Sequence, residues 1–183
     1  MLYTRKGDSG TTKTFGCDQR ISKSSAIAEA LGSMDEINSL LGVCKVLAAE
    51  VGAAHEGRSL ASVVGEVQHN LFIIQAELAG ADKRIMPEKV AQVEAIVDSI
   101  EKVLPPIKSF FVSGGSKLGA QFDYARAVSR RAERRVVRAK EEGNIALADA
   151  TLAYLNRLSS LLYALARLAN HLSGITEEPP TYR

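Results

Sequence analysis

The chain has 183 residues, of which 46% are hydrophobic and 24% are charged, and its formal net charge is +2. This length predicts a single domain that can bury a sizeable core without disulfides, and Cys17 and Cys44 do not form a disulfide framework. Scattered histidines without an H-E-x-x-H motif argue against a zinc hydrolase. No apolar run is long enough for a transmembrane helix and no signal-peptide stretch follows Met1, so we expect a cytoplasmic protein.

Residues 1–20 are rich in glycine, threonine, serine and aspartate without a sustained period, which predicts a loop containing at most a short strand. The glycine, hydroxyl and lysine content is typical of loops that cradle phosphates. The spacing is not that of a Walker A motif, because Gly7 and Gly10 are three residues apart and no G-K-[ST] follows. By composition alone, an ordinary turn remains the favoured alternative to a ligand loop.

The rest of the chain has helical periodicity. Apolar residues recur at steps of three and four, and the stretches end at proline or glycine, as at Pro105-Pro106 and Gly174. Ser116 is a candidate N-cap after a Gly-Gly turn. The pattern predicts an all-α, five-helix up-and-down bundle over residues 21–173, followed by a loose tail at 174–183. The expected helices cover about 24–47, 59–81, 87–103, 116–142 and 147–172.

Positive charge is concentrated in residues 126–140, which hold seven basic residues and one acid. This segment therefore carries +6 and the remainder of the chain −4. Such a local concentration suggests an anionic ligand, and the alternative is a solvated arginine-rich helix face. A nucleic-acid partner is disfavoured by the near-neutral total charge and by an aromatic content of 5%.

Several polar residues of the expected helices lie beside the apolar stripe. Helical rotation groups Arg126, Arg130, Glu133 and Arg134 within about a quarter turn, an arrangement suited to phosphate or carboxylate. Salt bridges are an equally good explanation. Asn156 is mildly unfavourable inside a helix, which invites a hydrogen-bonding role. In the first helix, Asp35 could pair with an arginine of a neighbouring helix or subunit, or could be ordinary surface polarity.

Taken together, these segments resemble the PduO-type ATP:cob(I)alamin adenosyltransferases. The order and spacing of the matching pieces cover nearly the whole chain. They are Tyr3–Gly10 (YTRKGDSG), Glu29–Ser39 (EALGSMDEINS), Phe110–Gly115 (FFVSGG), Ala125–Arg134 (ARAVSRRAER) and Leu155–Ser159 (LNRLS). The chain departs from the family's usual pattern at Ser113, where a proline commonly precedes Gly-Gly.

The resemblance implies a ferritin-like five-helix bundle that forms a homotrimer with active sites between adjacent subunits. The implied reaction transfers the 5′-deoxyadenosyl group of ATP to the cobalt of cob(I)alamin and releases triphosphate, with Mg²⁺ bridging phosphates. Implied partners are a cob(II)alamin reductase and an adenosylcobalamin-dependent enzyme, with no nucleic acid and no membrane. The alternative is a non-catalytic bundle that binds nucleotide or another anion as a sensor.

The resemblance also implies roles for single residues. Arg130 would stabilise the triphosphate leaving group, and Asn156 would hold the nucleotide. Arg126 would pair with Asp35 across the subunit interface, and Phe110 would lie below the corrin, where the lower axial ligand is displaced. The N-terminal loop and Lys23, which would contact phosphate, would bind ATP; these residues are Thr4, Arg5, Lys6, Gly7, Thr12, Lys13 and Lys23. Arg131, Glu133 and Arg134 of the fourth helix would support Arg130.

Overall fold

The computed structural model describes residues 3–15, 19–143 and 145–182. Within these ranges all five expected helices are present, and their ends lie within three residues of the expected limits. Two short antiparallel ribbons accompany them. The elements are β1 (Thr11–Thr12), β2 (Ile21–Ser22), α1 (Ala26–Glu50), β3 (Ala54–His55), β4 (Arg58–Ser59), α2 (Leu60–Leu78), α3 (Pro87–Glu101), α4 (Lys117–Gly143) and α5 (Asp149–Leu172).

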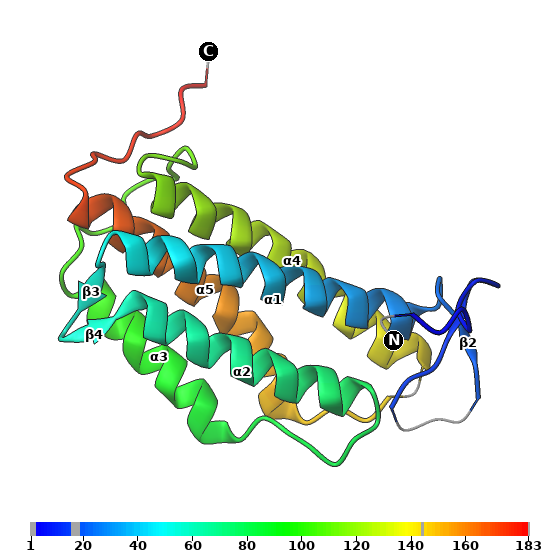
Figure 1. The fold of residues 1–183 in the computed structure, drawn as a ribbon. Coiled ribbons are helices and arrows are strands. Elements are labelled where there is room, and N and C mark those ends of the chain that lie inside the picture. Colours follow the sequence, from blue (N-terminus) through cyan, green and yellow to red (C-terminus); the bar gives the residue numbers. More distant parts are fainter. Residues whose placement is uncertain (1–2, 16–18, 144, 183) are drawn as a thin grey trace.

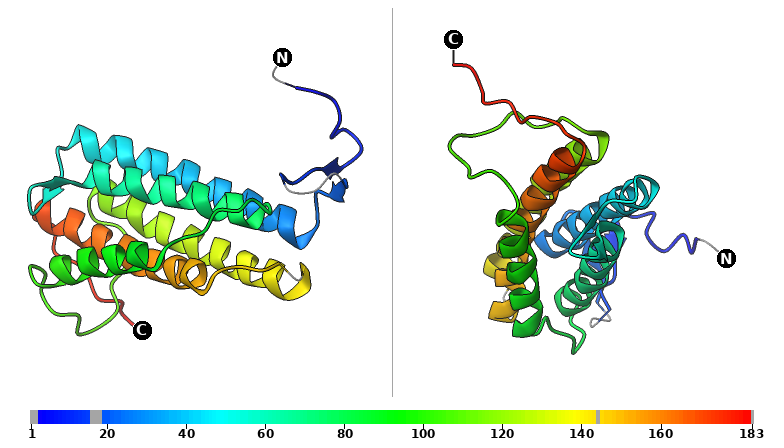
Figure 2. Two further views of the ribbon diagram at one scale, coloured as in Figure 1. Left: turned by 90° about the horizontal axis from the view of Figure 1, so that it is seen from below. Right: turned by 90° about the vertical axis from the view of Figure 1, so that its left-hand side faces the viewer.

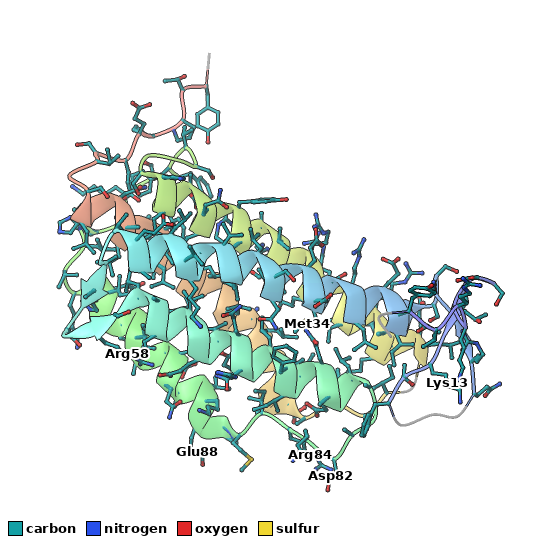
Figure 3. All side chains as sticks on the ribbon, in the orientation of Figure 1. Lys13, Met34, Arg58, Asp82, Arg84 and Glu88 are labelled. Atoms are coloured by element: carbon teal, nitrogen blue, oxygen red, sulfur yellow. The ribbon has the colours of Figure 1, made fainter. Side chains whose placement is uncertain are left out.

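The helices pack in the order α2–α1–α4–α5–α3. Helices that follow one another in the sequence run in opposite directions, so the neighbours α3 and α5 run in the same direction (Figure 1). Each helix contributes fully buried side chains to one core. Met34 points from α1 into the interior (Figure 3), where α2 and α5 contribute Leu71 and Tyr154. The Tyr154 hydroxyl accepts a hydrogen bond of 3.0 Å from Nδ2 of Asn70, so this buried polar group is satisfied.

Side chains cap the two helices that carry the candidate site. The Ser116 hydroxyl accepts a bond of 3.0 Å from the Gly119 amide, which confirms the expected cap of α4. The first residues of α5 have no such cap of their own. Instead, the buried carboxylate of Glu77 reaches over from α2 and accepts bonds from the Ala148 amide, at 2.7 Å, and from Thr151 Oγ1, at 2.5 Å. This cap therefore depends on the packing of two helices that are distant in the sequence.

The N-terminal segment is the expected loop with a short strand in it. Thr11 pairs with Ser22 and Thr12 with Ile21, so β1 and β2 form a minimal ribbon beyond one end of the helices (Figure 1). Cys44 is buried and free, whereas Cys17 lies outside the described residues. None of the described helices is long and apolar enough to cross a membrane.

The expectation of a loose C-terminal tail was wrong for residues 175–178. The Ile175 amide donates to the Asn170 carbonyl at 2.9 Å, and the Val112 amide donates to the Glu178 carbonyl at 2.8 Å. The carboxylate of Glu177 pairs with Arg167 at 2.9 Å. The tail is held because the α3–α4 connection and a buried arginine of α5 supply partners, which a local sequence pattern does not reveal.

Candidate functional site

The N-terminal loop is organised by Arg20. Its guanidinium donates to the carbonyl and to the hydroxyl of Thr11, both at 2.7 Å, and also to the Lys6 carbonyl. The Lys23 amide closes the loop by donating to the Gly10 carbonyl at 2.9 Å. Arg20 was not among the predicted residues, because nothing in its spacing distinguishes it from other surface arginines.

Lys23 and Gly7 lie against each other in this loop. A Cβ built on Gly7 would lie 3.1 Å from the Lys23 ammonium, so the glycine leaves room for the lysine. The Lys6 amide contacts the Thr4 hydroxyl at 3.4 Å, and Arg5 has a left-handed backbone with φ of 60°. The remaining two candidates, Thr12 in β1 and Lys13 directly after it, lie at the same end of the molecule, where Figure 3 labels Lys13. The structure therefore gathers the N-terminal candidates into one loop with several cationic side chains.

A second group of candidates lines a pocket of about 580 Å³ between α4, α5, the C-terminal tail and the connection that precedes α4. Phe110, Arg126 and Arg130, three of the candidate residues, line it together. Three further lining residues, Asp123, Tyr163 and Arg167, were missed by the sequence analysis. Only Arg167 leaves a signal in the sequence, since it interrupts an apolar run in α5.

Arg126 lies in this pocket with an incomplete set of partners. Its Nε is buried and has no hydrogen-bond acceptor, and it stands 3.8 Å from Oδ1 of Asp123. The guanidinium carbon lies 5.9 Å from the centre of the Tyr163 ring. Burial raises the pKa of Asp123, although the Gly114 amide and the charge of Arg126 oppose the shift. Arg126 therefore has unused capacity for a further acceptor.

Arg130 continues the same surface one turn along α4. Its side chain is exposed, and it makes no hydrogen bond or ion pair with any residue that the structure describes. Arg134 donates to the Arg130 carbonyl at 3.1 Å, and Asn156 of α5 donates to Glu133 at 3.3 Å. These candidates thus form a row along neighbouring faces of α4 and α5, and the Arg130 guanidinium is free to meet an anion.

Other arginines of the basic segment serve to join helices, as the salt-bridge alternative predicts. Arg131 pairs with Glu36 of α1 at 2.5 Å, and Arg135 pairs with Glu29 at 3.4 Å. Asp35 is exposed on α1 and forms no ion pair with any described residue of its own chain. The Arg126–Asp35 pair that the resemblance implies is therefore not made within one chain.

The N-terminal loop and the pocket lie at opposite ends of the molecule (Figures 1 and 2). The loop lies near the C-terminal end of α4, and the pocket lies toward its N-terminal end. At 1.5 Å per residue, about 25 Å of helix separates Arg126 from Gly143. A single chain therefore does not bring the two groups of candidate residues into contact.

The fold is helical, and its arginine-lined pocket is suited to an anionic ligand. The family model for cobalamin adenosyltransferase matches residues 2–169, and the chain belongs to this family.

Several curated relatives and solved structures are similar over most of this chain. The corrinoid adenosyltransferase PduO of Citrobacter freundii is 37% identical over 93% of this chain, and the corrinoid adenosyltransferase of Bacillus subtilis is 36% identical over 95%. The chain spans 50% of the length of the Citrobacter relative and 89% of the Bacillus relative. A PduO-type ATP:corrinoid adenosyltransferase variant from Lactobacillus reuteri, solved in complex with cobalamin and ATP, matches with a TM-score of 0.88 and 28% identity, over 100% of both chains.

Proposed function

We propose that this protein transfers the 5′-deoxyadenosyl group of ATP to the cobalt of cob(I)alamin, giving adenosylcobalamin and triphosphate. The observation that carries the proposal is the pocket in which Phe110, Arg126 and Arg130 meet in a member of this family. Its volume of about 580 Å³ is within the range of small-molecule sites, and a larger ligand would protrude through the open side.

Arg130 is the residue proposed to stabilise the departing triphosphate. Cob(I)alamin is itself a strong nucleophile, so the protein has no need of a general base at the 5′ carbon. Its tasks are to orient ATP and to place positive charge where negative charge develops. The exposed and unpaired guanidinium of Arg130 is suited to the second task, and the Glu133–Asn156 contact places two polar groups beside it for the nucleotide.

Phe110 is proposed to lie below the corrin and to exclude the lower axial ligand of cobalt. Its side chain is 79% exposed and lines the pocket, so it is available to a large apolar ligand. Removal of the lower ligand leaves four-coordinate Co(II), which is easier to reduce to Co(I) than the five-coordinate form. A reductase that delivers this electron, and an enzyme that uses adenosylcobalamin, are the partners that the reaction requires.

The active protein is proposed to be a homotrimer whose sites lie between subunits. Two features support this assembly: the N-terminal loop and the pocket lie at opposite ends of one chain, and Arg126 and Asp35 each lack a full partner within it. Pairing Arg126 with Asp35 of an adjacent copy would complete both. The functional unit is the cobalamin adenosyltransferase domain over residues 1–183, with the loop at 1–20, the bundle at 21–173 and the tail at 174–183.

Magnesium is proposed to be held mainly by ATP. Among the described residues there is no cluster of three histidine, cysteine, aspartate or glutamate side chains that could hold a metal ion. Mg²⁺ commonly keeps several waters and binds substrate phosphates, so the cationic residues of the loop and of α4 would act beside it. Bound in this way, the metal would neutralise phosphate charge.

The decisive test mixes the purified protein with ATP, Mg²⁺ and chemically reduced cobalamin without oxygen and follows the visible spectrum. Loss of the Co(I) band together with an equal amount of triphosphate is expected. A protein that binds ATP but releases no triphosphate would instead be the sensor that the sequence leaves as the alternative.

A further inference from the structure

The connection between α3 and α4, residues 102–116, carries Phe110 but has few hydrogen bonds of its own. Most of its residues are exposed, and only a few hydrogen bonds join it to the rest of the described structure. Figure 2 shows it running beside the C-terminal tail, away from α1 and α2. The conformation of Phe110 therefore depends on the residues that hold the two ends of this connection.

Arg167 of α5 holds the first part of the connection. Only 5% of this residue is exposed, and its guanidinium makes three contacts, two with the connection and one with the C-terminal tail. Nη2 donates to the Pro105 carbonyl at 2.9 Å, and Nε donates to Glu177 of the tail at 2.9 Å. The guanidinium carbon lies 5.2 Å from the centre of the Phe111 ring, directly next to Phe110 in sequence.

Asn170, one turn further along α5, holds the last part. It is 4% exposed, and its Oδ1 accepts bonds from the Ser116 amide at 2.8 Å and from the Ser116 hydroxyl at 2.9 Å. Its Nδ2 donates to the Gly114 carbonyl at 2.8 Å. A Cβ built on Gly115 would come within 2.7 Å of Oδ1, so the glycine turn fits closely around this amide.

We propose that Arg167 and Asn170 are positioning residues for Phe110, which together fix both ends of the segment that shapes the corrinoid pocket. This inference rests on the proposed function. Arg167 also joins the C-terminal tail to the same segment through its bond to Glu177, which lines the pocket. The Val112 amide adds a second link by donating to the Glu178 carbonyl. Neither residue is assigned contact with the reacting atoms: both act through the place they give Phe110.

The chemistry of Arg167 explains why lysine is an informative substitution. A planar guanidinium can lie over a ring and donate from its edge to two acceptors at once, whereas an ammonium is a point charge without a planar face. Arg167→Lys keeps the positive charge beside Glu177 and loses the combined contact with Pro105 and Phe111. Glu177→Ala is a second variant; it releases the tail from Arg167 at a position that is less deeply buried.

The experiment compares two rates for each variant: transfer to chemically pre-reduced Co(I), and transfer when Co(II) is reduced in place. In the proposed function, Phe110 acts on the reduction of cobalt more than on the transfer itself, since its proposed role is to exclude the lower ligand. Both variants should therefore slow the second rate about tenfold or more and slow the first rate much less. The four-coordinate Co(II) spectrum with ATP bound should weaken in parallel, while ATP affinity stays unchanged.

Arg58→Lys is the matched control. Arg58 pairs with Glu66 at the ribbon end of α2 (Figure 3), does not line the corrinoid pocket, and should leave both rates unchanged. A wild-type ratio of the two rates and a full four-coordinate signal in Glu177→Ala, and in Arg167→Lys where that variant folds, would overturn the inference. If the wild-type protein itself fails with pre-reduced Co(I), it is the proposed function that falls.

Discussion

At the scale of single residues, arginines of the same helix have different surroundings and therefore different expected roles. Arg131 is engaged by Glu36 of α1, whereas Arg130 has no partner within the described residues. An ion pair at the surface contributes little to stability, because water and salt screen it. An unpaired cation beside a pocket can instead act on a bound anion.

Arg130→Ala should lower kcat by about a hundredfold to a thousandfold, the usual effect of removing a group that stabilises developing charge. Arg131→Ala is the comparison, since it removes the same side chain from the next position. It should change stability little, because water and salt screen its surface ion pair, and should reduce the rate much less than Arg130→Ala does. Steady-state rates at saturating ATP, with chemical denaturation of both variants, check this. Equal losses of rate would contradict the assignment.

The buried Cys44 thiol makes stability depend on pH. Burial raises the pKa of Cys44 from 9.0 to about 11, because the interior disfavours the thiolate. Above pH 9 the unfolded chain loses this proton while the folded chain keeps it, so stability falls as the pH rises from 9 to 11. Burial likewise raises the pKa of Tyr154 to about 12, which adds a further loss at higher pH.

Cys44→Ala should therefore remove part of the alkaline loss of stability. Between pH 7 and pH 10, the wild-type protein should lose about 1 kcal/mol more of its unfolding free energy than the variant does. Urea denaturation of both proteins at several pH values measures this difference. The titratable groups that the two proteins share contribute equally to both curves and therefore drop out of the comparison. Parallel curves for the two proteins would show that Cys44 is not protected in the folded state.

At the scale of elements, α4 and α5 approach closely around Asn170. A Cβ built on Gly119 of α4 would lie 2.2 Å from the Asn170 amide oxygen, so the first turn of α4 has no room for a methyl group. The same amide binds the Gly-Gly turn that precedes the helix. The packing of the two helices and the shape of the connection are therefore coupled.

Gly119→Ala should destabilise the protein by about 1–3 kcal/mol, because the buried amide has to move and lose hydrogen bonds. Gly65→Ala in α2 provides the contrast. There a new Cβ meets only the flexible end of Lys45, at 3.5 Å. That change should be neutral or stabilising by up to about 1 kcal/mol, since alanine favours a helix over glycine. Thermal and urea unfolding compare the two, and similar effects in both would refute the close packing.

At the scale of the whole molecule, the proposed site requires two copies of the chain. In the proposed assembly, the N-terminal loop of one copy would complete the α4–α5 pocket of the next and so bring together two groups that are far apart within one chain (Figure 1). In a closed ring every subunit supplies one loop and one pocket, so each site combines residues of two chains.

Subunit complementation tests this arrangement. Lys23→Ala damages the proposed loop and Arg130→Ala the proposed pocket, and each variant alone should be nearly inactive. When the two are coexpressed and assemble at random, about a quarter of the sites combine an intact loop with an intact pocket. Purified mixed assemblies should regain a corresponding share of activity. No recovery, despite verified mixing, would mean that each site is built within one chain.

The sequence by itself determined the five helices and their approximate limits, because helical periodicity and proline and glycine boundaries are local properties of the chain. Ordered motifs such as ARAVSRRAER were sufficient to indicate the family. They also identified Phe110, Arg126 and Arg130, which the structure brings to one pocket.

Only the tertiary structure decided which polar groups meet. Glu77 caps α5, Arg131 joins α4 to α1, and Arg167 holds the tail. In each case the partner lies on another element that packs nearby, and a local sequence pattern does not show which elements pack together. The physical reason is that burial follows the periodicity of one helix, whereas the pairing of a polar side chain depends on the position and rotation of its neighbours.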